Sequence, residues 1–212
     1  MSGCRIMPLH TIRRALSQRL AGTLPGIEAQ LRFAPEPPGP GWQPGYFPPD
    51  ARIAAALLLV YPRGRQVVVP LTRRASGLAR HAGQVSLPGG AIDPGETLAE
   101  AALREASEEI GVDPASVQIL GELTPVHVTV SGFTLHPVVG ISEQRPAFAP
   151  APHEVDEILE VPIDDLRDAT RIRRGTRIRE GVSVEYPYFD LHGHQIWGAT
   201  AMVLGEFISL LE

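Results

Sequence analysis

An apolar run at residues 51–61 constrains the fold of this chain more than any other feature. Turn-forming residues bound the run on both sides, so it predicts a buried β-strand. It is too short to cross a bilayer, which takes about 20 apolar residues. A Pro-Arg-Gly-Arg turn at residues 62–65 follows, and then a second apolar strand at residues 66–71. This region is therefore predicted to form a buried hairpin.

The rest of the chain alternates between helical and extended patterns. Helical apolar spacing predicts helices at residues 9–21, 97–110, 163–166 and 199–211, with Gly111 as a C-terminal cap. Extended patterns predict strands at residues 117–123, 126–130 and 134–141, a loop entering a strand at 154–161, and a hairpin at 186–191 and 194–197. Residues 78–90 predict a loop with short extended pieces, and the Pro- and Gly-rich residues 35–49 an irregular connector.

These patterns together predict an α/β protein in which a mixed β-sheet is sandwiched between helices (α/β/α). We expect two parts. Residues 1–50 form an N-terminal amphipathic helix and the connector, and residues 51–212 form the main domain.

Composition narrows the possible partners and compartment. The net charge of −5 argues against a nucleic-acid-binding surface, and no signal peptide or membrane span is visible, so we expect a cytoplasmic protein. Cys4 is the only cysteine, which excludes an internal disulfide. The chain has no lysine, so any cationic contact to a phosphate must come from arginine. The oligomeric state stays open.

The helix at residues 97–110 carries an unusual concentration of acid. At about 100° per residue, Glu105, Glu108 and Glu109 lie within roughly 100° of one helix face and repel one another. Arg104 has the spacing to pair with Glu108 or Glu100. A solvated acidic face is one interpretation of this cluster. The other is half of a site for Mg²⁺ or Mn²⁺, which take oxygen ligands and share them with substrate phosphates.

The wider segment favours the metal site, because seven residues stand at fixed spacings. They are Gly90, Glu96, Arg104, Glu105, Glu108, Glu109 and Gly111. By chance such a match would occur on the order of once in ten million chains of this length. The segment resembles the Nudix box, with Ala106 as a mild departure where a larger aliphatic residue is usual. The resemblance implies the Nudix fold, a loop-helix-loop motif and metal-dependent hydrolysis of a diphosphate bond.

The resemblance also implies a role for each box residue. The metal ligands are Gly90, through its carbonyl, and Glu105, Glu108 and Glu109. Arg104 and Glu96 brace the loop-helix-loop. The implied catalytic set is Glu105, Glu108 and Arg104, with Glu154 added from outside the box as a candidate general base.

The flanking sequence resembles one branch of the superfamily, the coenzyme A pyrophosphatases. Residues 71–90 carry most of this likeness, and residues 131–133, 136–140 and 196–201 extend it. It implies a coenzyme A-like substrate contacted by Arg74, Arg80, His81, Gly83 and Gln84. The implied products are 4′-phosphopantetheine, or its acyl form, and adenosine 3′,5′-bisphosphate. Three positions depart from the pattern: Pro70, Ala79 and Leu87.

Several single residues allow a functional and a purely structural interpretation. Glu154 is a candidate general base or a surface acid, with Asp156 and Glu157 as neighbours that could take the role. His192 and His194 alternate in a hairpin without a third ligand, so we expect no metal site there. Trp197 is expected to be a core aromatic rather than a residue that stacks on adenine.

Two alternatives to a coenzyme A diphosphatase remain. One is a Nudix hydrolase for ADP-ribose, another nucleoside diphosphate derivative or a nucleoside triphosphate, which the departures at Ala79 and Leu87 allow. The other is a non-catalytic nucleotide-binding Nudix domain. Such domains typically lose box glutamates, whereas this chain keeps them all.

Overall fold

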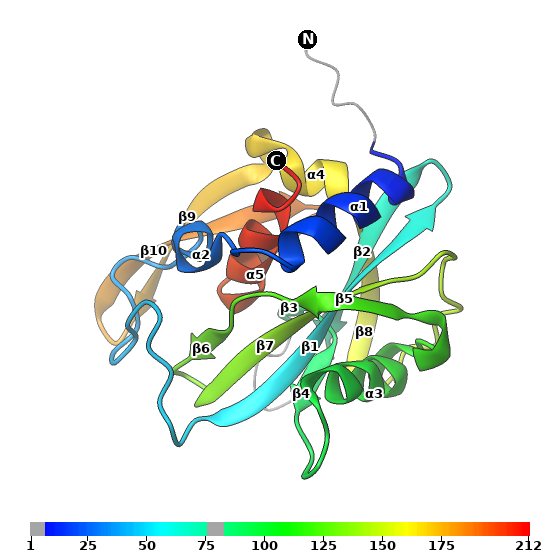
Figure 1. Cartoon of the computed structure of the whole chain (residues 1–212). Coiled ribbons are helices and arrows are strands. Elements are labelled where there is room, and N and C mark those ends of the chain that lie inside the picture. Colours follow the sequence, from blue (N-terminus) through cyan, green and yellow to red (C-terminus); the bar gives the residue numbers. More distant parts are fainter. Residues whose placement is uncertain (1–6, 76–82) are drawn as a thin grey trace.

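The structure is a computed structural model and describes residues 7–75 and 83–212 (Figure 1). The helices are α1 (Leu9–Leu20), α2 (Gly26–Leu31), α3 (Leu98–Ile110), α4 (Ile163–Arg167) and α5 (Ala199–Ser209), with two 3-10 turns at Pro114–Ser116 and Ala169–Arg171. The strands are β1 (Arg52–Arg63), β2 (Gln66–Arg74), β3 (Val85–Ser86), β4 (Gly89–Ala91), β5 (Gln118–Glu122), β6 (Val126–Val128), β7 (Phe133–Ile141), β8 (Val155–Pro162), β9 (Ile172–Arg179), β10 (Val182–Leu191) and β11 (His194–Trp197). No helix in the described part of the chain is both long and apolar enough to span a membrane.

A mixed sheet is built around β1. Its path runs β3-β2-β1-β7-β5, while β4 pairs with β1, β6 with β7 and β8 with β2. β1 and β2 form the predicted antiparallel hairpin, and β1 runs parallel to β7. The turn needs Gly64, whose φ of 61° is a conformation that side chains with a Cβ rarely adopt.

β1 buries both of its faces, which explains why its sequence is continuously apolar. Ala55, Leu57, Leu59 and Tyr61 pack in a cluster with the apolar face of α3. The alternate residues, among them Leu58, pack in a second cluster with α1 and α5. Successive strand side chains point to opposite faces, so one strand holds both helical layers. The predicted α/β/α sandwich is confirmed, and Figure 1 shows α3 on the side of the sheet away from α1 and α5.

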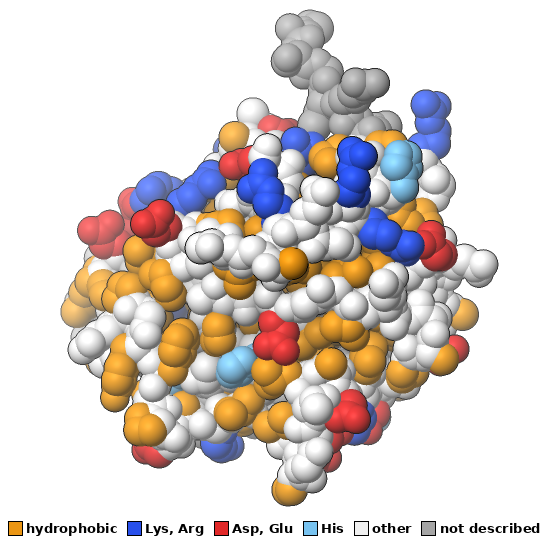
Figure 2. All heavy atoms as spheres, viewed as in Figure 1, with side chains coloured by type: hydrophobic (Ala, Val, Ile, Leu, Met, Phe, Trp, Pro, Cys, Tyr) orange, Lys and Arg blue, Asp and Glu red, His pale blue; other side chains and the backbone are white. Residues whose placement is uncertain are grey.

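The N-terminal fifty residues share this core. Ile12 and Leu16 of α1 are buried, while basic side chains gather on the outer side of the helix (Figure 2), as the predicted amphipathic pattern requires. Phe33 stacks on Phe189 with ring centroids 4.6 Å apart. It lies so close to Gly205 that a Cβ there would be 2.4 Å from its ring. The division of the chain at residue 50 stays a prediction.

A buried carboxylate ties the two ends of the chain together. Glu206 of α5 is fully buried and accepts hydrogen bonds from the Gly26 N–H at 3.2 Å and the Gln30 amide at 2.9 Å. Thr124 donates to the same carboxylate through its hydroxyl at 2.7 Å. Because every donor is an amide or hydroxyl, this carboxylate organises α2 against α5 rather than a catalytic centre.

The sequence did not predict α2 or the second, three-stranded sheet β11-β10-β9. α2 has six residues, too few for a helical period to emerge. β9 contains four arginines and two isoleucines, and its exposed positions hide the alternation that marks a half-buried strand. Of this sheet, only the hairpin of β10 and β11 was expected.

Candidate active site

The glutamate-bearing helix α3 begins one residue after the predicted start and ends at the predicted residue, Ile110. Thr97 caps its N-terminus: its hydroxyl accepts from the Glu100 N–H, and the Glu100 carboxylate accepts from the Thr97 N–H at 2.8 Å. Gly111 closes the C-terminus with a φ of 72°. A Cβ at Gly111 would also lie 2.9 Å from Ala149, so the position needs glycine on two grounds.

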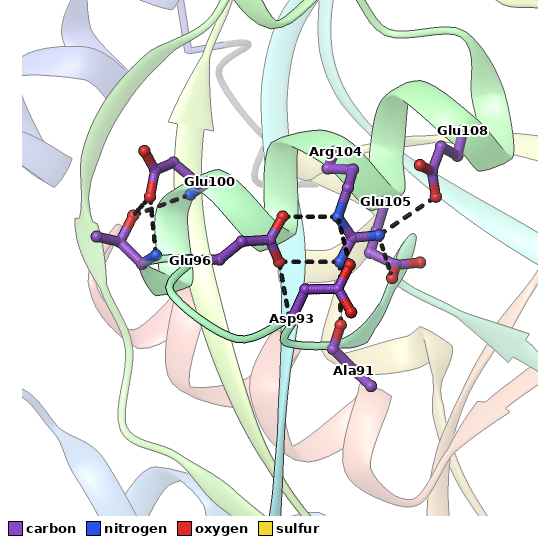
Figure 3. A network of polar contacts seen from close by, with 8 residues as sticks. Ala91, Asp93, Glu96, Glu100, Arg104, Glu105 and Glu108 are labelled. Carbon is purple, nitrogen blue, oxygen red and sulfur yellow. Dashed lines mark hydrogen bonds and ion pairs between the residues drawn. The ribbon is translucent and has the colours of Figure 1, made fainter.

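Arg104 organises the loop before α3, as the predicted bracing role requires (Figure 3). Its guanidinium donates to Glu96 at 2.7 and 3.1 Å and to the Ala91 carbonyl at 3.0 Å. It also donates to Glu105 at 2.8 Å and Glu108 at 3.3 Å. The hydrogen bonds from Arg104 lower the pKa of Glu96, so this loop stays locked at neutral pH. The other partner allowed by spacing, Glu100, is used by the N-cap instead.

Glu109 lies at the centre of a cluster of carboxylates. It is buried, and burial together with the negative charges of Glu105 and Glu154 raises its pKa to about 7. The charge of Arg74 and the Gly89 N–H, which donates to the Glu109 carboxylate, oppose that rise. Three acids from two distant segments thus face one another without enough positive charge between them.

Backbone hydrogen bonds hold Glu154 at this place. The Ala151 N–H donates to the Glu109 carbonyl at 2.8 Å, and the Glu154 N–H donates to the Ala151 carbonyl at 3.0 Å. The Glu154 carbonyl in turn accepts from the Ala75 N–H at 2.9 Å. The segment after residue 148 is therefore fastened to both α3 and the end of β2. Spacing along the chain carries no signal for this contact.

Gly90 approaches Glu105 more closely than any other residue type could. A Cβ at Gly90 would lie 2.5 Å from the Glu105 carboxyl carbon. The adjacent Gly89 pairs with Ala56 of β1, where a Cβ would lie 2.4 Å from the Ala55 carbonyl oxygen. The two glycines let the strand β4 lie flat beneath the acids of α3.

The predicted metal ligands come together only in part. Glu105, Glu109 and Gly90 converge, whereas Glu108 is 62% exposed and turns toward Arg104. Among residues 7–75 and 83–212, no three His, Cys, Asp or Glu side chains are arranged to hold a metal ion by themselves. The donors present are all oxygens, and the raised pKa of Glu109 reflects uncompensated negative charge. This chemistry fits a hard divalent cation that takes further ligands from phosphate and water.

A cavity of about 520 Å³ opens beside Gly89 and Gly90. Arg74 and Gln84, two predicted substrate contacts, line it. Gly83 holds the turn there, with a φ of 72° and its N–H donating to the Arg74 carbonyl at 3.1 Å, but it does not line the cavity. The predicted contacts Arg80 and His81 lie outside the described residues.

Parts of the chain that were not expected to contact the substrate also line this cavity. They are Pro35, Gly39 and Trp42 of the N-terminal connector, and Arg177, Arg179 and Trp197 of the second sheet. The expectation that Trp197 is a core aromatic is wrong: it lies at the cavity wall, with the guanidinium of Arg177 4.2 Å from its ring centroid. A hairpin position alternates between core and surface, so the sequence could not tell which face the cavity borders.

The remaining candidates lie away from the cavity. Arg73 of β2 is paired with Asp156 at 3.2 Å and Glu157 at 3.1 Å, whereas the ion-pair partner of Glu154 is His153 at 3.4 Å. His192 and His194 lie near different acids, Asp165 at 3.7 Å and Glu157 at 3.6 Å. The two histidines therefore share no acid among the described residues, and the expectation that they hold no metal stays a prediction.

Comparison with known proteins agrees with this geometry. A family model described as the NUDIX domain matches residues 50–180. The chain is 40% identical over 143 residues to the uncharacterized Nudix hydrolase NudL of Pectobacterium atrosepticum. This match covers 64% of this chain and 71% of that protein. It is 38% identical over 164 residues to NudL of Citrobacter koseri, covering 74% and 81%.

A solved structure, the C. elegans Ap4A hydrolase in a binary complex, is similar with a TM-score of 0.50. The match covers 76% of this chain and 97% of that one. At 16% sequence identity this likeness concerns the fold alone.

Proposed function

The chain belongs to the Nudix hydrolase family, and from this premise we propose that it hydrolyses the diphosphate bond of coenzyme A or its derivatives. At the coarser level it is a hydrolase that acts on a nucleoside diphosphate derivative. The products of the proposed reaction are 4′-phosphopantetheine, or its acyl form, and adenosine 3′,5′-bisphosphate. Cytoplasmic location and the absence of a nucleic-acid partner stay predictions from the sequence.

One observation carries the proposal: the carboxylate cluster borders a cavity whose charged lining residues are all arginines. Arg74 lines the cavity near Glu109, and Arg177 and Arg179 line it from β9. No Asp or Glu is among the described lining residues. Such a cavity accepts a molecule with several phosphate groups and an apolar or aromatic body. Coenzyme A has this chemistry.

Nudix hydrolases generally use divalent metal ions, and we propose Mg²⁺ or Mn²⁺ for this chain. Glu105, Glu108, Glu109 and the Gly90 carbonyl would hold it. When bound, such an ion supplies Lewis-acid polarisation of the diphosphate and a water of lowered pKa.

The chain's own residues supply the remaining steps. We assign Glu154 as the general base, because its charge lies near enough to Glu109 to raise the pKa of that carboxyl, and its ion-pair partner among the described residues is His153 rather than an arginine. Arg74 binds a phosphate oxygen, since its Nε is buried and has no hydrogen-bond partner in the described structure. Arg104 is a positioning residue that orients Glu105 and Glu108.

Product analysis tests this function. The purified protein is incubated with Mg²⁺ or Mn²⁺ and, separately, coenzyme A, 3′-dephospho-coenzyme A, ADP-ribose, NADH and a nucleoside triphosphate. Chromatography and mass spectrometry should detect adenosine 3′,5′-bisphosphate released from coenzyme A. Faster cleavage of another compound would reject coenzyme A and retain the Nudix chemistry. Binding without metal-dependent turnover of any of them would favour the non-catalytic alternative.

A further inference from the structure

Two arginines of β9 line the cavity but have no individual contact assigned in the proposed reaction. Arg177 and Arg179 are two residues apart on one strand, so both side chains leave the same face, and both line the cavity. Between them in sequence, Ile178 points to the other face and is exposed. The two arginines thus place two positive charges on one wall.

Neither arginine is neutralised within the described structure. No Asp or Glu lies within ion-pairing distance of Arg177 or Arg179 among the described residues, and the side-chain hydrogen bond of Arg179 goes to the Pro38 carbonyl at 2.9 Å. By contrast, Arg173 and Arg174 on the same strand pair with Asp190 and Glu185. The strand therefore carries two arginines that are ion-paired with acids and two that face the cavity without an acidic partner among the described residues.

The surroundings of Arg177 are those of a binding group. Its guanidinium lies 4.2 Å from the ring centroid of Trp197 and 5.7 Å from that of Tyr186, which fixes its plane. Its Nε is buried without a hydrogen-bond partner in the described residues. Burial and the neighbouring charge of Arg179 lower its pKa, so the arrangement costs free energy that an anion would recover.

This cationic wall is separate from the one that serves the diphosphate. Arg74 belongs to β2 of the large sheet and lies close enough to Glu109 to lower its pKa. Arg177 and Arg179 belong to the other sheet, and Arg179 lies against the N-terminal connector at Pro38 and Gly39. One cavity thus presents positive charge from two different sheets.

We propose that Arg177, Arg179 and Trp197 form a second phosphate subsite, which binds a phosphomonoester on the substrate's nucleoside while its diphosphate lies at the carboxylate cluster. The inference rests on the proposed function and deepens it: in coenzyme A this group is the 3′-phosphate. Trp197 lines the cavity beside the arginines and holds the guanidinium of Arg177 against its ring. The subsite therefore favours substrates that carry this phosphomonoester over the same compounds without it.

Kinetics with a matched pair of substrates tests the subsite. The preference of the full-length protein for coenzyme A over 3′-dephospho-coenzyme A is compared with that of the Arg177→Gln and Arg179→Gln variants. Each variant should raise KM for coenzyme A about tenfold or more, because a charge-assisted contact is lost. KM for the dephosphorylated compound should change by less than about twofold. Arg174→Gln, on the same strand but paired with Glu185, is the control and should keep the wild-type preference.

A binding measurement separates this inference from the proposed function. Isothermal titration of the metal-free protein with adenosine 3′,5′-bisphosphate and with 5′-AMP requires no turnover. If neither coenzyme A compound is hydrolysed, the proposed function fails. The subsite then stands only if the bisphosphate binds more tightly than AMP and the two glutamine variants remove that difference. Thermal melting checks that Arg177→Gln and Arg179→Gln fold. If the folded variants prefer coenzyme A over 3′-dephospho-coenzyme A as strongly as Arg174→Gln does, the subsite is overturned even if coenzyme A is the substrate.

Discussion

The Cα of Gly90 lies directly against the Glu105 carboxylate, leaving no space for a β-carbon, which would be 2.5 Å from the carboxyl carbon. Arg104 holds the same carboxylate at 2.8 Å from its other side. Glu105 is thus positioned between a glycine and an arginine of the same motif. This contact explains the separation of Gly90 from Glu105 in the sequence: the loop that contains Gly90 lies against α3 at Glu105, one helical turn before the buried Glu109.

Gly90→Ala should therefore abolish most of the activity without unfolding the protein. The methyl group would displace Glu105 from its proposed position as a metal ligand, and we expect kcat to fall by about 10²-fold or more, because a misplaced catalytic group has that cost. Steady-state turnover with coenzyme A and Mg²⁺ measures it. Gly22→Ala is the control, since its Cβ would lie 3.6 Å from the nearest atom. Equal activity of both variants would show that the close approach does not position Glu105.

Glu154→Gln should remove the proposed proton acceptor while leaving substrate binding nearly unchanged. We expect kcat to fall by roughly 10²- to 10⁴-fold with little change in KM, the range typical of a general base. The matched control is Glu157→Gln, whose carboxylate is already paired with Arg73. Rate measurements across pH 5–9 complete the test. A larger loss in Glu157→Gln than in Glu154→Gln would move the base assignment to the neighbour.

Glu109→Gln should lower turnover by several orders of magnitude and yet stabilise the metal-free fold above neutral pH. Burial and the charges of Glu105 and Glu154 raise the pKa of Glu109 to about 7 from 4.5. An acid whose pKa is raised by folding contributes stability below pH 4.5, and this contribution is lost as the pH rises through about 7. The loss amounts to about 3 kcal/mol in wild type, and the glutamine variant avoids it.

Urea denaturation in chelator at pH 5 and pH 8 checks this sign. The free energy of unfolding of Glu109→Gln minus that of wild type should be larger at pH 8 than at pH 5. Glu108→Gln serves as the comparison, because its carboxylate is 62% exposed and should show little pH-dependent difference. A Glu109→Gln variant with the same pH dependence as wild type would contradict the buried repulsion.

Local pattern was sufficient to predict the elements that the site depends on. The apolar run in β1, the helix at residues 97–110 and the Gly111 stop are encoded by residues adjacent in the chain, so their positions are close to those expected. The resemblance to the Nudix box likewise implied the bracing of Glu96 by Arg104, since both belong to one loop-helix unit.

Contacts between distant segments could not be predicted in the same way. The position of Glu154 near Glu109 depends on backbone hydrogen bonds from Ala151 and Ala75. Because any residue with a backbone N–H can make such bonds, they leave no pattern in the sequence. Nothing in the sequence singles out the arginines of β9, and only the cavity separates Arg177 and Arg179 from their paired neighbours.

Glu206→Gln should weaken the whole molecule, because its carboxylate joins the N-terminal helix α2 to the C-terminal helix α5. The Glu206 oxygens accept from Gly26, Gln30 and Thr124, and a glutamine would place its NH₂ group against one of these donors. We expect the free energy of unfolding to fall by about 1–3 kcal/mol, the cost of an unsatisfied buried polar group. Glu28→Gln, an exposed acid on α2, is the control and should change it by less than about 0.5 kcal/mol. Urea denaturation measures both variants. Equal stabilities would mean that α2 is held by its apolar contacts alone and that residues 1–50 add little polar binding to the main domain.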